Sequence, residues 1–164
     1  MYKPGKLGQW QAAWIKSLKS GIHRQTKGKL TRKHRDGSWG HCCLGLACEV
    51  SITNGIDLSV QVNNNIVSYN LTFESLPKSE EYRYGFYNSL GKINIGALYA
   101  MERNGKVSRD EMTSLLKEFD EMRGTCKKHG NNTSLAMMND SGKTFEQIAA
   151  FVERFPRTVF KSSR

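Results

Sequence analysis

The stretch that decides the fold reads Ile56-Asp57-Leu58-Ser59-Val60-Gln61-Val62-Asn63-Asn64-Asn65-Ile66-Val67-Ser68-Tyr69-Asn70-Leu71. Apolar and polar residues alternate on both sides of the three asparagines, and a period of two is typical of a half-buried strand. The apolar side chains expected on one face of the first strand are Ile56, Leu58, Val60 and Val62. The stretch therefore predicts a β-hairpin with strands over residues 56–62 and 66–71.

A second hairpin is predicted just upstream of this one. Its strands are expected over residues 25–31 and 38–41, around the polar turn Lys33-His34-Arg35-Asp36-Gly37. Asp-Gly at the tip of a turn is a strong hairpin signal because glycine accepts the positive φ that such a turn requires. The two hairpins together predict a small antiparallel sheet.

Helices are predicted at both ends of the chain. Residues 7–19 place apolar side chains at helical spacing and stop at Ser20-Gly21, while residues 145–155 form a regular apolar stripe between the capping box at Thr144 and Pro156. Further helices are expected over residues 43–50, after Pro77, and over residues 95–103, 108–123 and 133–138. The prediction is an α+β fold, a single domain over residues 1–156 with a flexible basic tail over residues 157–164.

Composition narrows the class of protein. The chain has 164 residues, and no apolar run reaches the roughly 18 to 20 residues that cross a bilayer. The first residues carry no apolar secretory segment, so we expect a cytoplasmic protein without a membrane partner. Four cysteines in a chain of this length do not make a disulfide scaffold.

The positive charge is concentrated at the start of the chain. The formal net charge is +10, and residues 1–35 hold ten Lys or Arg without any acidic residue, Asp36 being the first carboxylate. The remaining residues are formally neutral, with fifteen basic and fifteen acidic side chains. A local positive field raises the concentration of anions near it, so the sequence predicts an anionic partner.

The candidate binding residues come from this basic segment. Arg and Lys side chains would contact phosphates, Gly28 would let a phosphate approach the backbone, and Trp39 or His41 would stack on a base. The residues predicted to bind the ligand are Arg24, Gln25, Lys27, Lys29, Arg32, Arg35, Trp39 and His41. A solvated hairpin that only aids solubility is the alternative interpretation.

The cysteines and histidines do not predict a cofactor. Cys42, Cys43 and Cys48 have the wrong spacing for a familiar zinc site, and the pair Cys126 and His129 lies far along the chain. Buried core cysteines are the favoured interpretation. A catalytic thiol at Cys42 or Cys43, with a pKa lowered at a helix start, is the less favoured alternative.

A polar turn before the last helix resembles part of a phosphate-binding loop. Gly142-Lys143-Thr144 matches the end of a P-loop, but Met137 stands where its first glycine should fall and no strand precedes it. We therefore exclude a P-loop and expect Asn139, Asp140 and Ser141 to cap and turn the chain.

Three sets of residues form a recognisable combination. They are Trp14…Leu18-Lys19-Ser20-Gly21…Gln25…Gly28…Leu30, then Cys42-Cys43-Leu44-Gly45-Leu46-Ala47-Cys48-Glu49, and finally Leu135…Met138-Asn139-Asp140-Ser141-Gly142-Lys143-Thr144-Phe145…Ile148-Ala149…Val152-Glu153. Together they resemble a family of small bacteriophage-encoded proteins. The resemblance covers both ends of the chain and leaves residues 51–130 uncovered. It implies a phage origin, location in an infected bacterial cell, and no catalytic role.

The leading functional hypothesis is a non-enzymatic protein that sequesters an anionic nucleotide signal, cyclic or ADP-ribose-type, to counter host antiviral defence. One alternative is a DNA- or RNA-binding phage protein, which would add the basic tail at Arg157, Lys161 and Arg164. Others are an inhibitor that docks on an acidic host protein, and a nucleotide-cleaving enzyme. The sequence leaves open whether the chain forms a homo-oligomer.

Overall fold

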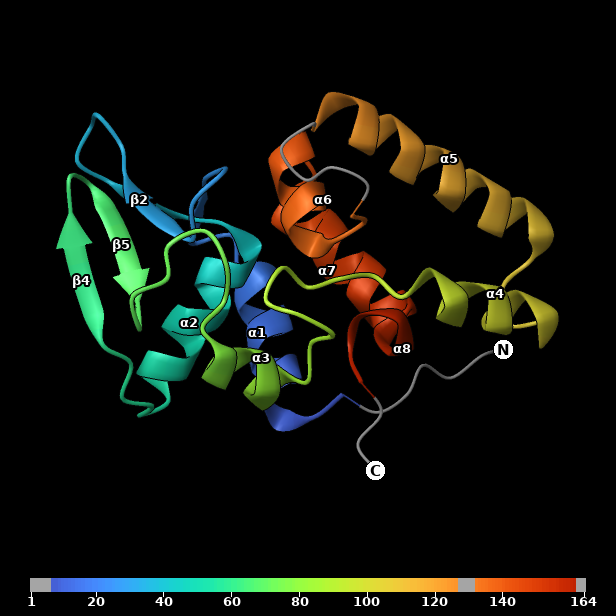
Figure 1. Ribbon diagram of the computed structural model, residues 1–164, viewed down its shortest axis with the longest axis horizontal. Coiled ribbons are helices and arrows are strands. Elements are labelled where there is room, and N and C mark those ends of the chain that lie inside the picture. The colour runs from blue at the N-terminus through green and yellow to red at the C-terminus, as the bar shows by residue number, and fades with distance from the viewer. Residues whose placement is uncertain (1–6, 127–131, 162–164) are drawn as a thin grey trace.

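The expected hairpin is present and forms one edge of a five-stranded sheet (Figure 1). The computed structural model describes residues 7–126 and 132–161. The helices in this part of the chain are α1 (Gln9–Leu18), α2 (Cys43–Thr53), α3 (Lys78–Tyr84), α4 (Ile95–Arg103), α5 (Arg109–Thr125), α6 (Leu135–Ser141), α7 (Phe145–Arg154) and α8 (Pro156–Val159). The strands are β1 (Arg24–Gln25), β2 (Thr31–Lys33), β3 (Trp39–His41), β4 (Val60–Asn63) and β5 (Ile66–Tyr69).

The predicted α+β class is confirmed, and an antiparallel pair of strands flanks each of the two predicted turns. The strand order is β1-β3-β2-β5-β4, with antiparallel pairing throughout except that β1 runs parallel to β3. Figure 1 shows the sheet on one side of the molecule and α4 to α8 on the other, with α1 and α2 between them. No helix in the described ranges is both long enough and apolar enough to span a membrane.

The first predicted strand, over residues 25–31, is wrong. Only Arg24–Gln25 and Thr31–Lys33 are strands, and the residues between them form a loop that leaves the sheet. Gly28 in this loop has φ +75°, which an extended strand does not allow. Its N–H donates to Asp140 Oδ1 at 2.9 Å, and the N–H of Leu30 donates to the Phe73 carbonyl at 2.8 Å. We call residues 26–30 the loop segment below.

The edge hairpin departs from its predicted burial. Its turn is a two-residue one, with Asn64 and Asn65 at φ +47° and +66°, so the pairing of β4 with β5 has a defined register. Val67 and Tyr69 on β5 are buried, as alternation requires. On β4, however, the predicted inward face is open to solvent, because β4 is the outermost strand.

The core contains α2 and the aromatic side of α1. Trp14 is fully buried and its Nε1 donates to the Cys43 carbonyl at 2.7 Å. Gly45 lets α2 lie directly against the loop segment, since a Cβ at this position would stand 1.8 Å from the Leu30 carbonyl oxygen. The Cys-Cys-Leu-Gly motif is therefore a packing motif.

The flexible tail predicted from residue 157 is corrected for the part that the structure describes. Pro156–Val159 form α8, and Thr158, Val159 and Phe160 are buried. Phe160 packs against Trp14, with ring centroids 6.3 Å apart. The chain therefore stays on the core as far as Lys161, while residues 162–164, with Arg164, lie outside the described residues.

Candidate functional site

The residues predicted to bind an anion do not form one site. Arg24 and Gln25 lie on β1, Lys27 and Lys29 in the loop segment, and the other four in or beside the β2–β3 hairpin. The pairing register decides which of them share a face, because side chains opposite each other on paired strands point the same way.

That register separates the predicted phosphate contacts from the predicted stacking residues. Arg24 and Arg32 both pair with Gly40, so their side chains are on one face of the sheet. His41 and Trp39 belong to the alternate positions of β3 and point to the other face. A small ligand held between Arg24 or Arg32 and one of these rings is therefore excluded by the fold.

The side-chain amide of Gln25 is hydrogen-bonded within the protein and is not free to contact a ligand. Its Nε2 donates to Asn139 Oδ1 at 2.8 Å and to the Lys143 carbonyl at 2.7 Å. These bonds attach β1 to the end of α6.

His41 is likewise part of a hydrogen-bonded network. Its Nδ1 lies 2.8 Å from Thr31 Oγ1, which accepts a hydrogen bond from the Tyr69 hydroxyl at 2.8 Å. The Tyr69 hydroxyl also contacts the Glu49 carboxylate. Burial is the main cause that lowers the pKa of His41. Its contact with Thr31 and its edge contact with the His23 ring, whose centroid is 5.9 Å away, leave the ring poorly placed to stack on a base.

Two of the predicted cations are neutralised by acids from elsewhere in the chain. Arg24 Nη1 lies 2.5 Å from Asp36 Oδ2, and hydrogen bonds from Ser38, followed by that from Arg24, hold the pKa of Asp36 below its usual range. Lys29 Nζ lies 2.5 Å from Glu74 Oε1. Asp36 and Glu74, which follow residues 1–35 in the sequence, thus lie beside basic side chains of that segment in the fold.

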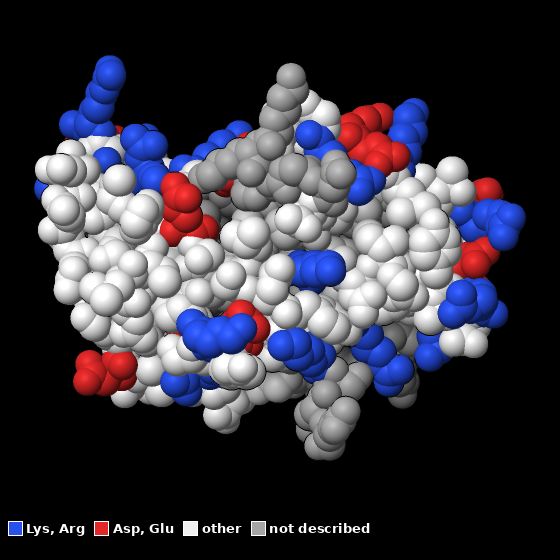
Figure 2. Space-filling model, in the orientation of Figure 1, with Lys and Arg blue, Asp and Glu red and all other residues white. Residues whose placement is uncertain are grey.

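Part of the remaining charge gathers at the end of the β2–β3 hairpin, while the exposed Lys27 lies apart from it in the loop segment. We define the hairpin tip as Arg32, Lys33, Arg35 and Trp39. Its three cations form no ion pair within residues 7–126 and 132–161, and Trp39 is 40% exposed with Lys33 Nζ 5.7 Å from its ring centroid. Figure 2 shows Lys and Arg side chains projecting from the corner of the molecule where this hairpin turns.

A second constellation is structural, and it joins the three sets of residues that carry the family resemblance. Asn139 is fully buried, its Nδ2 donates to the Thr26 carbonyl at 2.7 Å, and its Oδ1 accepts from Gln25 and from the Cys43 N–H at 3.1 Å. Asp140 accepts from the Gly28 N–H. These side chains hold the loop segment against α2.

The structure corrects the predicted role of the Asn139-Asp140-Ser141 motif. These residues belong to α6 instead of a turn, and Gly142, at φ +104°, ends the helix. Sequence reasoning missed the contact of Asn139 with residues more than a hundred positions earlier. The signal was present, since Gln25, Gly28 and Asn139 all carry the resemblance.

The cysteine side chains in α2 and at its start are buried and unreactive. Burial raises the pKa of Cys42 to about 11 and that of Cys43 and Cys48 well above the ordinary value, so the thiols are protonated at pH 7. A thiolate nucleophile at these positions is not supported. In the part of the chain that is described, no three His, Cys, Asp or Glu side chains gather to hold a metal ion; His129 lies outside it.

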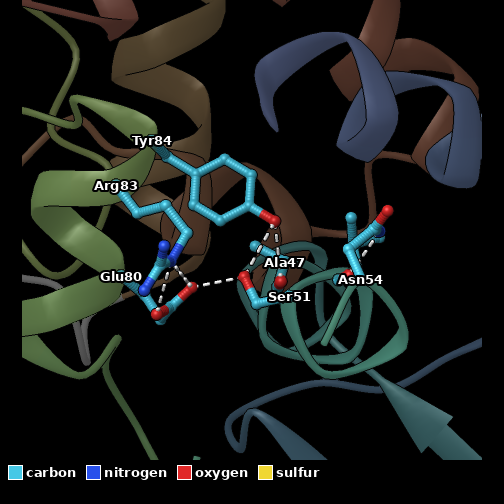
Figure 3. Close-up of polar contacts among 7 residues, drawn as sticks. Ala47, Ser51, Asn54, Glu80, Arg83 and Tyr84 are labelled. Atoms are coloured by element: carbon cyan, nitrogen blue, oxygen red, sulfur yellow. Dashed lines mark hydrogen bonds and ion pairs between the residues drawn. The ribbon is translucent and has the colours of Figure 1, made fainter. Parts of the chain in front are cut away.

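A buried carboxylate joins α3 to α2 (Figure 3). Glu80 has no exposed surface, accepts a hydrogen bond from the Ser51 hydroxyl, and pairs with Arg83 Nε at 3.1 Å. The Tyr84 hydroxyl donates to the Ala47 carbonyl at 2.8 Å in the same cluster. Because no substrate can reach Glu80, the cluster is a packing device.

Two hollows lie away from the hairpin tip. One, of about 340 Å³, is lined by Gly28, Lys29 and Cys42 together with the carboxylates Glu74 and Asp140. The other, of about 870 Å³, lies between the start of α1, α3 and α8, where Arg83, Arg157 and Lys161 accompany Glu81. Arg83 pairs with Glu80 and Lys161 with Glu81 at the larger hollow, and Lys29 pairs with Glu74 at the smaller one. These ion pairs reduce the positive charge that would attract an anion.

The comparisons with known proteins bear on the family. A protein-family model described as "Domain of unknown function (DUF8296)" matches residues 8–155. No curated protein and no solved structure matches the chain. The matched range includes α1, the whole sheet, α2 and α7, and therefore all three sets of residues that converge on the loop segment. On this match over most of its length, the chain belongs to the family described as Domain of unknown function (DUF8296).

Proposed function

We propose that the protein binds nucleic acid through the hairpin tip. Arg32, Lys33 and Arg35 would contact phosphates on both faces of the hairpin, and Trp39, on the same face as Lys33, would stack on an unpaired base. The observation that carries the proposal is the contrast in pairing: Arg24 and Lys29 have acidic partners, whereas the tip cations have none in the described ranges. Lys and Arg side chains without an acidic partner are available to bind phosphates. Exposed aromatic rings stack on bases whatever the nucleotide sequence.

The shape of the tip favours a polynucleotide over a small nucleotide. Small ligands are held in concave sites that cover most of their surface, whereas the tip projects from the molecule (Figure 2). The hollow beside Lys29 would enclose a small ligand, but Glu74 and Asp140 line it as well. Sequestration of a cyclic or ADP-ribose-type nucleotide, and with it the role against host defence, stays a prediction.

The charges of the tip are expected to control affinity. The variant Arg32→Glu/Lys33→Glu/Arg35→Glu should lose binding to a fluorescein-labelled single-stranded oligonucleotide, measured by anisotropy. For the wild type, log K should fall with log salt at a slope of about −2, because roughly three phosphates are neutralised on a single strand. The matched control is Lys92→Glu/Arg103→Glu/Lys117→Glu, which changes the net charge equally at exposed positions on and before α4 and on α5.

The outcomes separate the proposed partner from the alternatives. Equal loss in both triple variants would mean that only the overall charge matters and would contradict the hairpin tip as the site. Trp39→Ala should weaken single-strand binding by about 1–3 kcal/mol. A cyclic or ADP-ribose-type nucleotide that raises the melting temperature, with no oligonucleotide bound, would favour sequestration instead.

A further inference from the structure

The outer edge of β4 is uncovered. β4 is the last strand in the order β1-β3-β2-β5-β4, and Figure 1 shows no element beyond it. Lys, Pro and other charged side chains are the usual means of blocking an open edge. The strand Val60–Asn63 contains none of them. Such an edge is a template for another strand.

The hairpin geometry shows which backbone groups face outward. The two-residue turn makes Asn63 and Ile66 a hydrogen-bonded pair, so Gln61 and Ser68, two positions further on, form the next such pair. The Asn70 N–H donates to the Ser59 carbonyl at 2.7 Å, which continues this alternation. The N–H and C=O groups of Val60 and Val62 therefore point away from β5, toward the open edge.

The side chains of the same two residues form an apolar extension of the core face. Val60 pairs with Tyr69 and Val62 with Val67, so all four share one face. Tyr69 is 0% and Val67 is 5% exposed, whereas Val60 is 48% and Val62 is 61% exposed. The buried face of the sheet thus runs out to its edge without a cover.

We propose that β4 pairs with β4 of a second copy of this chain, antiparallel about a two-fold axis at Gln61. In this register Val60 of one copy exchanges both backbone hydrogen bonds with Val62 of the other, and the reverse, because antiparallel pairing brings those positions opposite each other. A two-fold interface uses the same patch on both copies. With the axis at Gln61, each copy contributes the same residues, Val60 to Val62, to the junction. The valine side chains then cover one another across the junction.

Charge complementarity favours a second copy as the occupant. The same register places Ser59 of one copy opposite Asn63 of the other, so Asp57, two residues before Ser59, comes near the β4–β5 turn at Asn64 and Asn65. Asn65 lies beside the basic turn, since its carbonyl accepts the Lys33 N–H at 2.7 Å, and Arg35 follows within that turn. Asp57 is exposed and forms no ion pair in the described part of the chain. Each dimer therefore gains two attractions between Asp57 and the basic turn.

Sedimentation of the purified protein alone tests the pairing. The wild type should dimerise as its concentration rises from micromolar to millimolar, and Val62→Lys should weaken dimerisation by about tenfold or more, because a charge enters the junction twice per dimer. Ile22→Lys is the matched control, since Ile22 is 79% exposed and lies away from β4. A dimer that both variants leave intact would overturn the proposal. A wild type that stays monomeric at all these concentrations would overturn it as well.

A charge swap tests the register. Asp57→Lys alone and Arg35→Glu alone should each dimerise more weakly than the wild type. A mixture of the two should form heterodimers, because one contact then joins the introduced lysine to the introduced glutamate and the other keeps Asp57 with Arg35. In amide exchange, the Val60 and Val62 N–H groups should become protected only at concentrations that give dimer. The antiparallel register would be contradicted if the mixture dimerised no more tightly than either variant alone. Amide protection of Val60 and Val62 that did not depend on protein concentration would contradict it as well.

Discussion

Gly45→Ala is expected to lower the free energy of unfolding by about 3 kcal/mol, the upper part of the range for overpacking a core. The added Cβ would stand 1.8 Å from the Leu30 carbonyl oxygen and 2.5 Å from its carbon. That backbone cannot move aside freely, because the Leu30 carbonyl accepts the Cys42 N–H and its own N–H donates to Phe73, each at 2.8 Å. Urea unfolding followed by circular dichroism measures the loss.

Gly124→Ala is the control for this substitution. Gly124 is also helical, in α5, and a Cβ there would meet no atom within 4 Å. Alanine is the better helix former, so this variant should lose no stability. If Gly45→Ala unfolded at the same urea concentration as the wild type, the close packing of α2 on the loop segment would be refuted.

Asn139→Ala is expected to cost about 3 kcal/mol as well. The substitution leaves the Cys43 N–H, the Thr26 carbonyl and the Gln25 amide without their buried partner, and each unsatisfied buried group costs about 1–3 kcal/mol. Thermal and urea unfolding should both register the loss. The effect should also free the loop segment, which raises the amide exchange of Gly28.

Asn54→Ala provides the comparison for Asn139. Asn54 Nδ2 makes a single bond, to the Val50 carbonyl at 2.7 Å, at the exposed end of α2 (Figure 3). Its removal should cost less than about 1 kcal/mol. Equal losses from the two asparagines would mean that Asn139 does not connect α6 to β1 and α2.

The sequence predicted the elements whose patterns are local. The stripe of α7 and its capping box are both present, with the Thr144 hydroxyl accepting the Gln147 N–H at 3.2 Å. The extent of α2 was underestimated, since it continues to Thr53. β1 was missed because two residues give no periodicity, and its parallel pairing with β3 depends on a loop whose partners lie more than a hundred residues away.

The candidate site was predicted only in part, for a physical reason. The excess of positive charge before Asp36 is visible in the sequence, but its neutralisation depends on Glu74 and on the path of the chain. Likewise, the faces of Arg32 and Trp39 follow from the pairing of β2 with β3, which begins only at Thr31 because residues 26–30 leave the sheet. Composition therefore located the charged segment, and only the fold separated its free cations from its paired ones.

NMR mapping of nucleic-acid contacts on the isotopically labelled protein is the most direct test of binding at the hairpin tip. A short single-stranded oligonucleotide should be titrated into the protein at low salt while backbone amide and tryptophan side-chain NMR signals are followed. We expect the largest shifts over residues 31–41 and at the Trp39 indole N–H, with the α4 and α5 signals unmoved. Shifts confined to the hollow near Arg83 and Arg157, or no shift at any residue, would contradict binding at the hairpin tip.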